Sequence, residues 1–147
     1  MRVDVITDFD LVWGVEVAAV RMLTDEVKRP ELINREHLYA LVDKIIQDKT
    51  AVVAFNNEDK PVGCIAGVLV PNLFNPQIKT LAEIIWYILP EYRGTRIAAM
   101  LLKRYTELAE EIADEATLSL LPTSNVNCSS MEKRGLKQEK YCFRRER

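Results

Sequence analysis

The sequence predicts a single domain of mixed α/β fold, in which helices flank a central sheet. Its 147 residues and 16.9 kDa are the size of one domain. The 48% hydrophobic and 29% charged residues are typical of a globular protein, as is the modest content of five Gly and six Pro. Segments with the periodicity of strands and of helices alternate along the chain, without a repeat or a linker. We therefore expect residues 1–147 to form one domain.

Hydrophobic periodicity and turn residues define the elements of the first half. Polar and apolar residues alternate at the N-terminus, which is typical of a half-exposed strand. Two segments with apolar residues at three- and four-residue steps indicate helices, and Asn34 is a good N-cap for the second. Two β-branched segments on either side of the turn at 56–61 indicate a hairpin. In order, we expect a strand at 2–7, helices at 11–28 and 34–48, and strands at 50–55 and 62–70.

The second half begins with the most apolar segment of the chain, which carries a single charge, Glu83. Within it Trp86 alternates with Ile84 and Ile88, so we expect these three side chains on one face. Gly135 stands where a short helix would end in a left-handed residue. In order, we expect a strand at 80–89, a turn at 90–95, an amphipathic helix at 96–114, a short strand at 117–121, a short helix at 125–134 and a last strand at 136–143.

Composition argues against several functional classes. The formal charge of −2 argues against a nucleic-acid partner, which would favour a basic domain. The three cysteines (Cys64, Cys128 and Cys142) are far apart and His37 is the only histidine, so we expect no metal site and a reduced, cytoplasmic setting. The sequence has no apolar run long enough for a membrane span, and its acidic N-terminus is unlike a signal peptide.

The junction between the apolar strand and the next helix is the most informative segment. A helix that starts after a tight turn presents free N–H groups and a partial positive charge, which suit an anion such as phosphate. The basic residues of this helix gather at its start and the acids at its end, the reverse of the order that the helix dipole favours. The bases are Arg93, Arg96, Lys103 and Arg104, and the acids are Glu107, Glu110, Glu111, Asp114 and Glu115. A helix with an incidental charge order is the alternative interpretation.

This junction resembles the signature of the GNAT superfamily of N-acetyltransferases, Gln/Arg-x-x-Gly-x-Gly/Ala, often found within Pro-Glu-Tyr-Arg-Gly. Here the segment reads Pro90-Glu91-Tyr92-Arg93-Gly94-Thr95-Arg96-Ile97-Ala98. Arg93 and Ala98 match the signature, whereas Arg96 stands where a glycine is usual. The order of elements also resembles that of the family, and so does Met131-Glu-Lys-Arg-Gly-Leu136.

The resemblance implies a central mixed, mostly antiparallel sheet that is splayed between its fourth and fifth strands. It also implies that acetyl-CoA is the cosubstrate. The amides of the turn would bind its pyrophosphate, and the backbone of the fourth strand would pair with its pantetheine arm. The cofactor-binding residues implied in this way are Ile88, Leu89, Arg93, Gly94, Thr95, Arg96, Ile97 and Ala98.

Glu83 is the candidate general base, because burial on an uncharged strand should raise the pKa of its carboxyl toward neutrality. A frayed, solvated position or a structural ion pair is the alternative. The family often has a tyrosine as general acid where this chain has Met131, so Tyr141 is the candidate in its place. Ser129, Ser130 or water could also take this role, and Tyr141 could instead belong to the core.

Taken together, these features predict an N-acetyltransferase that transfers an acetyl group from acetyl-CoA to a primary amine of a small molecule or a protein. The amine would attack the thioester directly in a ternary complex. The alternative is a catalytically impaired domain of the same fold that binds CoA or another protein, which the departures at Arg96 and Met131 motivate. Many relatives form dimers, so a homodimer is possible.

Overall fold

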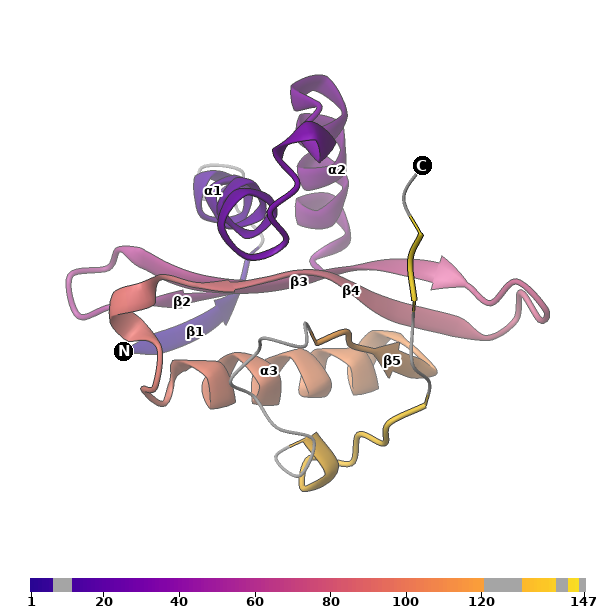
Figure 1. The fold of residues 1–147 in the computed structure, drawn as a ribbon. Coiled ribbons are helices and arrows are strands. Elements are labelled where there is room, and N and C mark those ends of the chain that lie inside the picture. The colour runs from indigo at the N-terminus through magenta and orange to yellow at the C-terminus, as the bar shows by residue number, and fades with distance from the viewer. Residues whose placement is uncertain (7–11, 121–130, 140–142, 146–147) are drawn as a thin grey trace.

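The computed structural model describes residues 1–6, 12–120, 131–139 and 143–145, and its framework is a five-stranded sheet in the order β1-β2-β3-β4-β5 (Figure 1). Neighbouring strands are antiparallel except for β4 and β5, which are parallel. The mixed, mostly antiparallel sheet that the resemblance implied is therefore confirmed. The strands are β1 (Arg2–Val5), β2 (Ala51–Phe55), β3 (Pro61–Pro71), β4 (Lys79–Ile88) and β5 (Glu115–Thr117).

Helices cover both faces of the sheet, so the molecule has three layers (Figure 1). α1 (Val12–Arg21) and α2 (Arg35–Asp48) pack on one face, and α3 (Ile97–Ile112) packs on the other. Alternate residues of β2 divide between the two resulting clusters of buried side chains, Val53 facing α1 and α2 and Val52 facing α3. No helix in the described ranges has the length and apolar composition needed to cross a bilayer.

The helix predicted at 11–28 is shorter in the structure. Regular α1 ends at Arg21 and continues as a π-helical turn, η2 (Met22–Glu26), in which the Val27 N–H donates to the Met22 carbonyl at 2.9 Å. Lys28 then adopts a left-handed conformation with φ of 58°. A non-glycine residue in that region ends the helical path, which the apolar periodicity of the segment does not reveal.

The predictions for α2 and for the hairpin are confirmed. Asn34 caps α2, its side-chain oxygen accepting from the His37 N–H at 3.1 Å. In the β2–β3 turn, the side-chain oxygen of Asn56 accepts from the N–H groups of Glu58 and Lys60. These side-chain bonds to nearby backbone are the reason that asparagine favours helix starts and turns.

The C-terminal part departs most from the predictions. The short strand predicted at 117–121 lies instead at Glu115–Thr117, because Asp114 and Glu115 already bond to Lys79 and Thr80 of β4, and residues 118–120 are irregular. Gly135 ends a helical turn with φ of 82°, as predicted, whereas residues 125–130 lie outside the described part. The last strand predicted at 136–143 is wrong in its described residues, which are irregular and pair with no strand there. Phe143, at the end of this segment, is 94% exposed.

Candidate active site

A β-bulge in the middle of β4 defines the geometry of the site. Ala66 pairs with Ile85 and Gly67 pairs with Glu83, so Ile84 is an extra residue on β4. Ile84 and Ile85 both pack toward α1 and α2, whereas Trp86 packs toward α3. The prediction that Ile84 shares a face with Trp86 is therefore wrong, because a bulge shifts the alternation by one residue.

The sheet opens beside this bulge. Pairing between β4 and β5 runs only from Thr80 and Glu115 to Ala82 and Thr117, after which β4 continues without a neighbour on this side in the described residues. The free edge of β4 runs from Glu83 to Ile88. The splay between the fourth and fifth strands that the resemblance implied is present.

The backbone groups that this edge offers come from alternate residues. The Leu89 N–H donates to the Val62 carbonyl at 2.9 Å, and the Leu89 carbonyl accepts from the Tyr92 N–H, so both groups of Leu89 are used within the chain. Because antiparallel pairing alternates, Trp86 and Ile88 point their backbone groups away from β3 and toward the open edge. The resemblance implied Ile88 and Leu89 at this edge. Trp86 could not be predicted from the sequence, because the direction of a backbone group depends on the pairing of strands.

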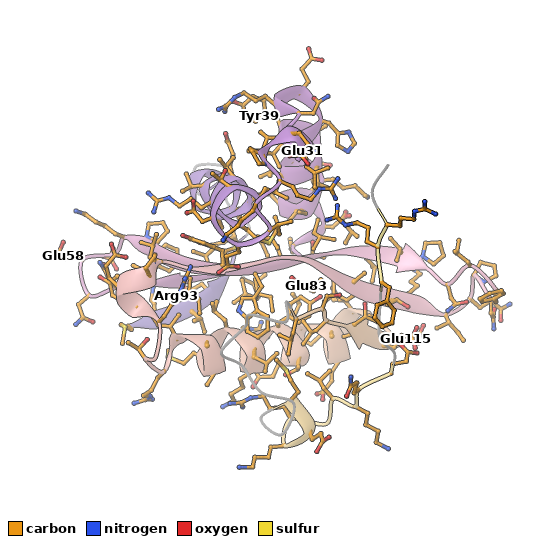
Figure 2. The ribbon with its side chains drawn as sticks, in the orientation of Figure 1. Glu31, Tyr39, Glu58, Glu83, Arg93 and Glu115 are labelled. Atoms are coloured by element: carbon orange, nitrogen blue, oxygen red, sulfur yellow. The ribbon has the colours of Figure 1, made fainter. Side chains whose placement is uncertain are left out.

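Glu83 lies at the point where β4 and β5 separate, between the sheet and α3 (Figure 2). The Ser119 N–H donates to its Oε2 at 3.3 Å across the gap. Burial raises the pKa of the Glu83 carboxyl to about 7, although the bond from Ser119 lowers it in part. The expected shift of this pKa toward neutrality is thus present, and a carboxyl that exchanges its proton near pH 7 is suited to acid–base chemistry.

The turn after β4 has the shape of an anion site. It passes through a short 3₁₀ turn, η4 (Pro90–Tyr92), and Gly94 then takes a φ of 78°, which favours glycine. Arg96 has φ of −73° and ψ of −7°, values open to any residue. The arginine at the position where the family signature has glycine therefore needs no unusual backbone conformation.

Several amides at the start of α3 are available to a ligand. The Ile97 N–H donates to the Thr95 hydroxyl at 3.3 Å, and the Arg93 N–H donates to the Pro90 carbonyl. The N–H groups of Gly94, Thr95, Arg96 and Ala98 have no acceptor within the described part of the chain. Free amides at a helix start are groups that suit an anion such as phosphate.

The two arginines of the turn have different surroundings. The Arg93 side chain turns back toward the sheet, where Nε donates to the Ile88 carbonyl at 3.0 Å and Nη2 lies 3.1 Å from Glu26 Oε1 (Figure 2). Its guanidinium also lies 5.3 Å from the centre of the Tyr87 ring. Arg93 thus holds the turn against η2 with its side chain, whereas Arg96 is exposed and forms no ion pair with any described residue.

The other two basic residues near the start of α3, Lys103 and Arg104, are neutralised by acidic side chains of the same helix. Arg104 pairs with Glu107 and Glu111, and Lys103 lies 4.0 Å from Glu107. The positive charge that remains for a ligand at the helix start is therefore that of Arg96, together with the helix dipole.

The candidate general acid cannot be placed in this geometry. Tyr141, Ser129 and Ser130 lie outside the described residues. Met131 is 7% exposed and begins the turn that ends at Gly135. No group of His, Cys, Asp and Glu side chains in the described ranges could hold a metal ion.

A helix start with free amides beside the open edge of a strand is the arrangement that the resemblance implied. Residues 19–135 match the model of the acetyltransferase (GNAT) family. Because that match spans most of the 147 residues, the chain belongs to the acetyltransferase (GNAT) family. It is an acyltransferase, and acetyl-CoA is its cosubstrate. No curated protein sequence is a significant match.

Solved structures share the whole fold at low sequence identity. A crystal structure of a probable acetyltransferase is 16% identical, with a TM-score of 0.71 over 100% of this chain and 99% of the other. AAC(6')-Iy in complex with the bisubstrate analogue CoA-S-monomethyl-acetylneamine is 13% identical, with a TM-score of 0.70 and the same coverage. A predicted acetyltransferase with acetyl-CoA from Clostridium acetobutylicum is 18% identical, with a TM-score of 0.72 over 99% and 94% of the two chains.

Proposed function

We propose that this protein is an N-acetyltransferase that transfers the acetyl group of acetyl-CoA to a primary amine of a small molecule or a protein. The observation that carries the proposal is the position of Glu83. Its carboxyl, with a pKa of about 7, lies where the open edge of β4 begins. A base there can take the proton of an amine that approaches the gap between the strands.

Each part of the site has a distinct task in this proposal. When bound, acetyl-CoA supplies the reactive thioester. The free amides of Gly94, Thr95, Arg96 and Ala98 bind its pyrophosphate, and the Arg96 guanidinium adds a charged contact. The backbone of Trp86 and the N–H of Ile88 pair with the pantetheine arm along the free edge of β4, since the Ile88 carbonyl already accepts from Arg93 Nε.

In this proposal Glu83 accepts the proton of the amine, directly or through water, as the nitrogen attacks the thioester in a ternary complex. General-base assistance of this kind is worth about 10²–10⁴-fold in rate. Tyr141 is the proposed general acid that protonates the departing thiolate, as the sequence analysis suggested.

The test is the pH dependence of turnover in Glu83→Gln, measured as CoA release with a panel of amines. Glu110→Gln is the matched control, since Glu110 is exposed on α3. We expect kcat of the wild type to rise through pH 7, and kcat of Glu83→Gln to be at least about 10²-fold lower without that inflection. Full turnover of Glu83→Gln at every pH would contradict the assignment.

A catalytically impaired domain that binds CoA is the second candidate, favoured by the buried methionine at position 131. It predicts that acetyl-CoA raises the thermal stability of the protein while no amine releases CoA. A saturating ligand at 100 times its Kd adds about 2.7 kcal/mol to the free energy of unfolding, so binding alone is readily measured.

We further propose a single domain over residues 1–147, a cytoplasmic location and assembly as a homodimer. The cytoplasmic location rests on Cys64, which is free and buried. A surface suited to self-association is the tip of the β3–β4 hairpin, where Leu73 is 97% and Phe74 98% exposed. Asn72 holds this tip in place through side-chain bonds from the N–H groups of Phe74 and Asn75.

A further inference from the structure

Besides the Ser119 N–H, a second polar group lies in the neighbourhood of Glu83. It is the hydroxyl of Tyr105, which comes from α3. The side chain is fully buried against the sheet, and its hydroxyl donates to the Leu81 carbonyl of β4 at 3.3 Å. In sequence Tyr105 is only one of the residues on the apolar face of the helix, so its position beside the base is visible only in the folded chain.

Gly67 makes room for this hydroxyl. Gly67 is the cross-strand partner of Glu83 on β3, so any side chain at position 67 would stand beside Glu83 on the same face of the sheet. A Cβ built on Gly67 would lie 2.7 Å from Tyr105 Oη and 2.7 Å from the Ala82 carbonyl oxygen. The Tyr105 hydroxyl therefore occupies the space that a side chain at position 67 would fill, next to Glu83.

The proton of the Tyr105 hydroxyl is directed away from the base. Because the hydroxyl donates its proton to the Leu81 carbonyl, it can only accept a hydrogen bond from Glu83. It can accept a hydrogen bond from a protonated carboxyl but has no proton to offer a carboxylate. Burial, together with the charge of Glu83, raises the pKa of Tyr105, so this hydroxyl stays protonated near neutral pH.

Among the described residues, the hydrogen bond to the Glu83 carboxyl comes from Ser119. The Ser119 N–H after β5 favours the ionised form, and β3 contributes no side chain at Gly67. No Lys or Arg in the described residues pairs with the carboxyl. Burial and the Ser119 N–H therefore set the balance between its two protonation states, and the Tyr105 oxygen lies beside Gly67, the cross-strand partner of Glu83.

We propose that Tyr105 is a positioning residue for Glu83, holding the carboxyl toward the gap between β4 and β5 and favouring its protonated form from the space that Gly67 leaves open. The catalytic meaning of this arrangement rests on the proposed role of Glu83 as general base. The physical coupling between the two side chains does not depend on that role, and it can be measured without any substrate.

The test is a pH titration of the Glu83 side-chain carboxyl carbon by NMR, in the wild type and in Tyr105→Phe. We expect the midpoint to fall by about one unit in Tyr105→Phe, because the variant removes an oxygen that favours the protonated form. Tyr87→Phe is the matched control, since its hydroxyl also bonds within the protein, to Asp25, but on the opposite face of β4. An unchanged midpoint in folded Tyr105→Phe, or an equal fall in Tyr87→Phe, would overturn the proposal.

A second measurement keeps the test open if Tyr105→Phe does not fold. The ring carbon that bears the hydroxyl of Tyr105 should titrate with Glu83 in the wild type and lose that inflection in Glu83→Gln. An identical pH profile of this carbon in both proteins would refute the coupling.

The kinetic readout separates this proposal from the proposed function. If Glu83 is the base and Tyr105 positions it, the pH at which kcat falls to half on the acid side shifts in Tyr105→Phe by the same amount as the NMR midpoint. KM for acetyl-CoA is then unchanged. If Glu83→Gln retains full turnover while the midpoint still falls in Tyr105→Phe, the base assignment fails and the coupling stands. A shift of the kinetic limb without a shift of the midpoint would refute the role of Tyr105.

Discussion

Glu83 and Ser119 are joined across the opening of the sheet, the Ser119 N–H donating to Glu83 Oε2 at 3.3 Å. The bond lies just beyond the last pair of β4 and β5, Ala82 and Thr117. The titratable carboxyl is therefore fixed at the inner end of the gap, whereas the helix start with the free amides lies beyond the other end of β4. A ligand that reaches from the amides to the carboxyl must run along the whole free edge of β4.

The buried carboxyl predicts a pH-dependent stability. The pKa of Glu83 is higher in the folded chain, at about 7, than its ordinary value of 4.5. The stabilisation from its protonated form is thus complete below about pH 4.5 and is lost as the pH rises through 7. We expect Glu83→Gln, which does not titrate, to be more stable than the wild type at pH 8, by on the order of 2 kcal/mol, and similar to it at pH 4.

Denaturant unfolding at a series of pH values checks this prediction. Glu110→Gln on the exposed side of α3 should show no such pH-dependent difference. A constant difference in free energy of unfolding between Glu83→Gln and the wild type from pH 4 to 8 would contradict it.

Arg96 is expected to contribute to the affinity for acetyl-CoA through its side chain. Reversing its charge in Arg96→Glu removes a charged contact to phosphate and places a carboxylate at the helix start, so Kd should rise by roughly 10–100-fold. Lys103→Glu, on the same helix at an exposed position, should change Kd far less. Calorimetric titration measures both, and equal losses of affinity in the two variants would argue against a specific contact.

Two glycines with the same conformation allow backbone strain to be separated from binding. Gly94 and Gly135 have φ of 78° and 82°, and a Cβ on either would meet no atom within 4 Å. Substitution of either by alanine should cost roughly 1–2 kcal/mol of stability. Only Gly94→Ala should also weaken acetyl-CoA binding, because only Gly94 shapes the turn before α3. Equal affinity of the two variants in thermal-shift titrations would count against the turn as the pyrophosphate site.

The hairpin tip is expected to mediate self-association. Replacing Leu73 and Phe74 by serine removes the exposed apolar pair without touching the core, so the monomer should fold normally. Sedimentation of the wild type should show a dimer and that of the double variant a monomer. A monomeric wild type, or a dimer that survives the double substitution, would show that the tip does not join two copies.

The parts of the fold that local sequence controls were predictable. The apolar stripe of α2, its Asn34 cap and the hairpin turn at Asn56 depend on residues within a few positions of one another. The end of α1 was predicted too late, because the π turn at Met22–Glu26 depends on a backbone choice that the apolar pattern does not encode. The strand at 136–143 failed for a different reason, since a strand needs a neighbouring edge as well as a pattern.

The features of the candidate site also fall into those that local sequence predicts and those that depend on distant parts of the chain. The sequence by itself determined the glycine-containing turn before the helix, the family and the isolated charge of Glu83, because each is carried by consecutive residues. Only the tertiary structure decided that Arg93 turns toward the sheet while Arg96 forms no ion pair in the described residues, and that Trp86 rather than Leu89 faces the open edge. It also decided that Gly67 pairs with Glu83 and leaves room for the Tyr105 hydroxyl. These are relationships between separate strands and helices. They depend on a one-residue bulge at Ile84 and on the register of pairing, which no local stretch of sequence specifies.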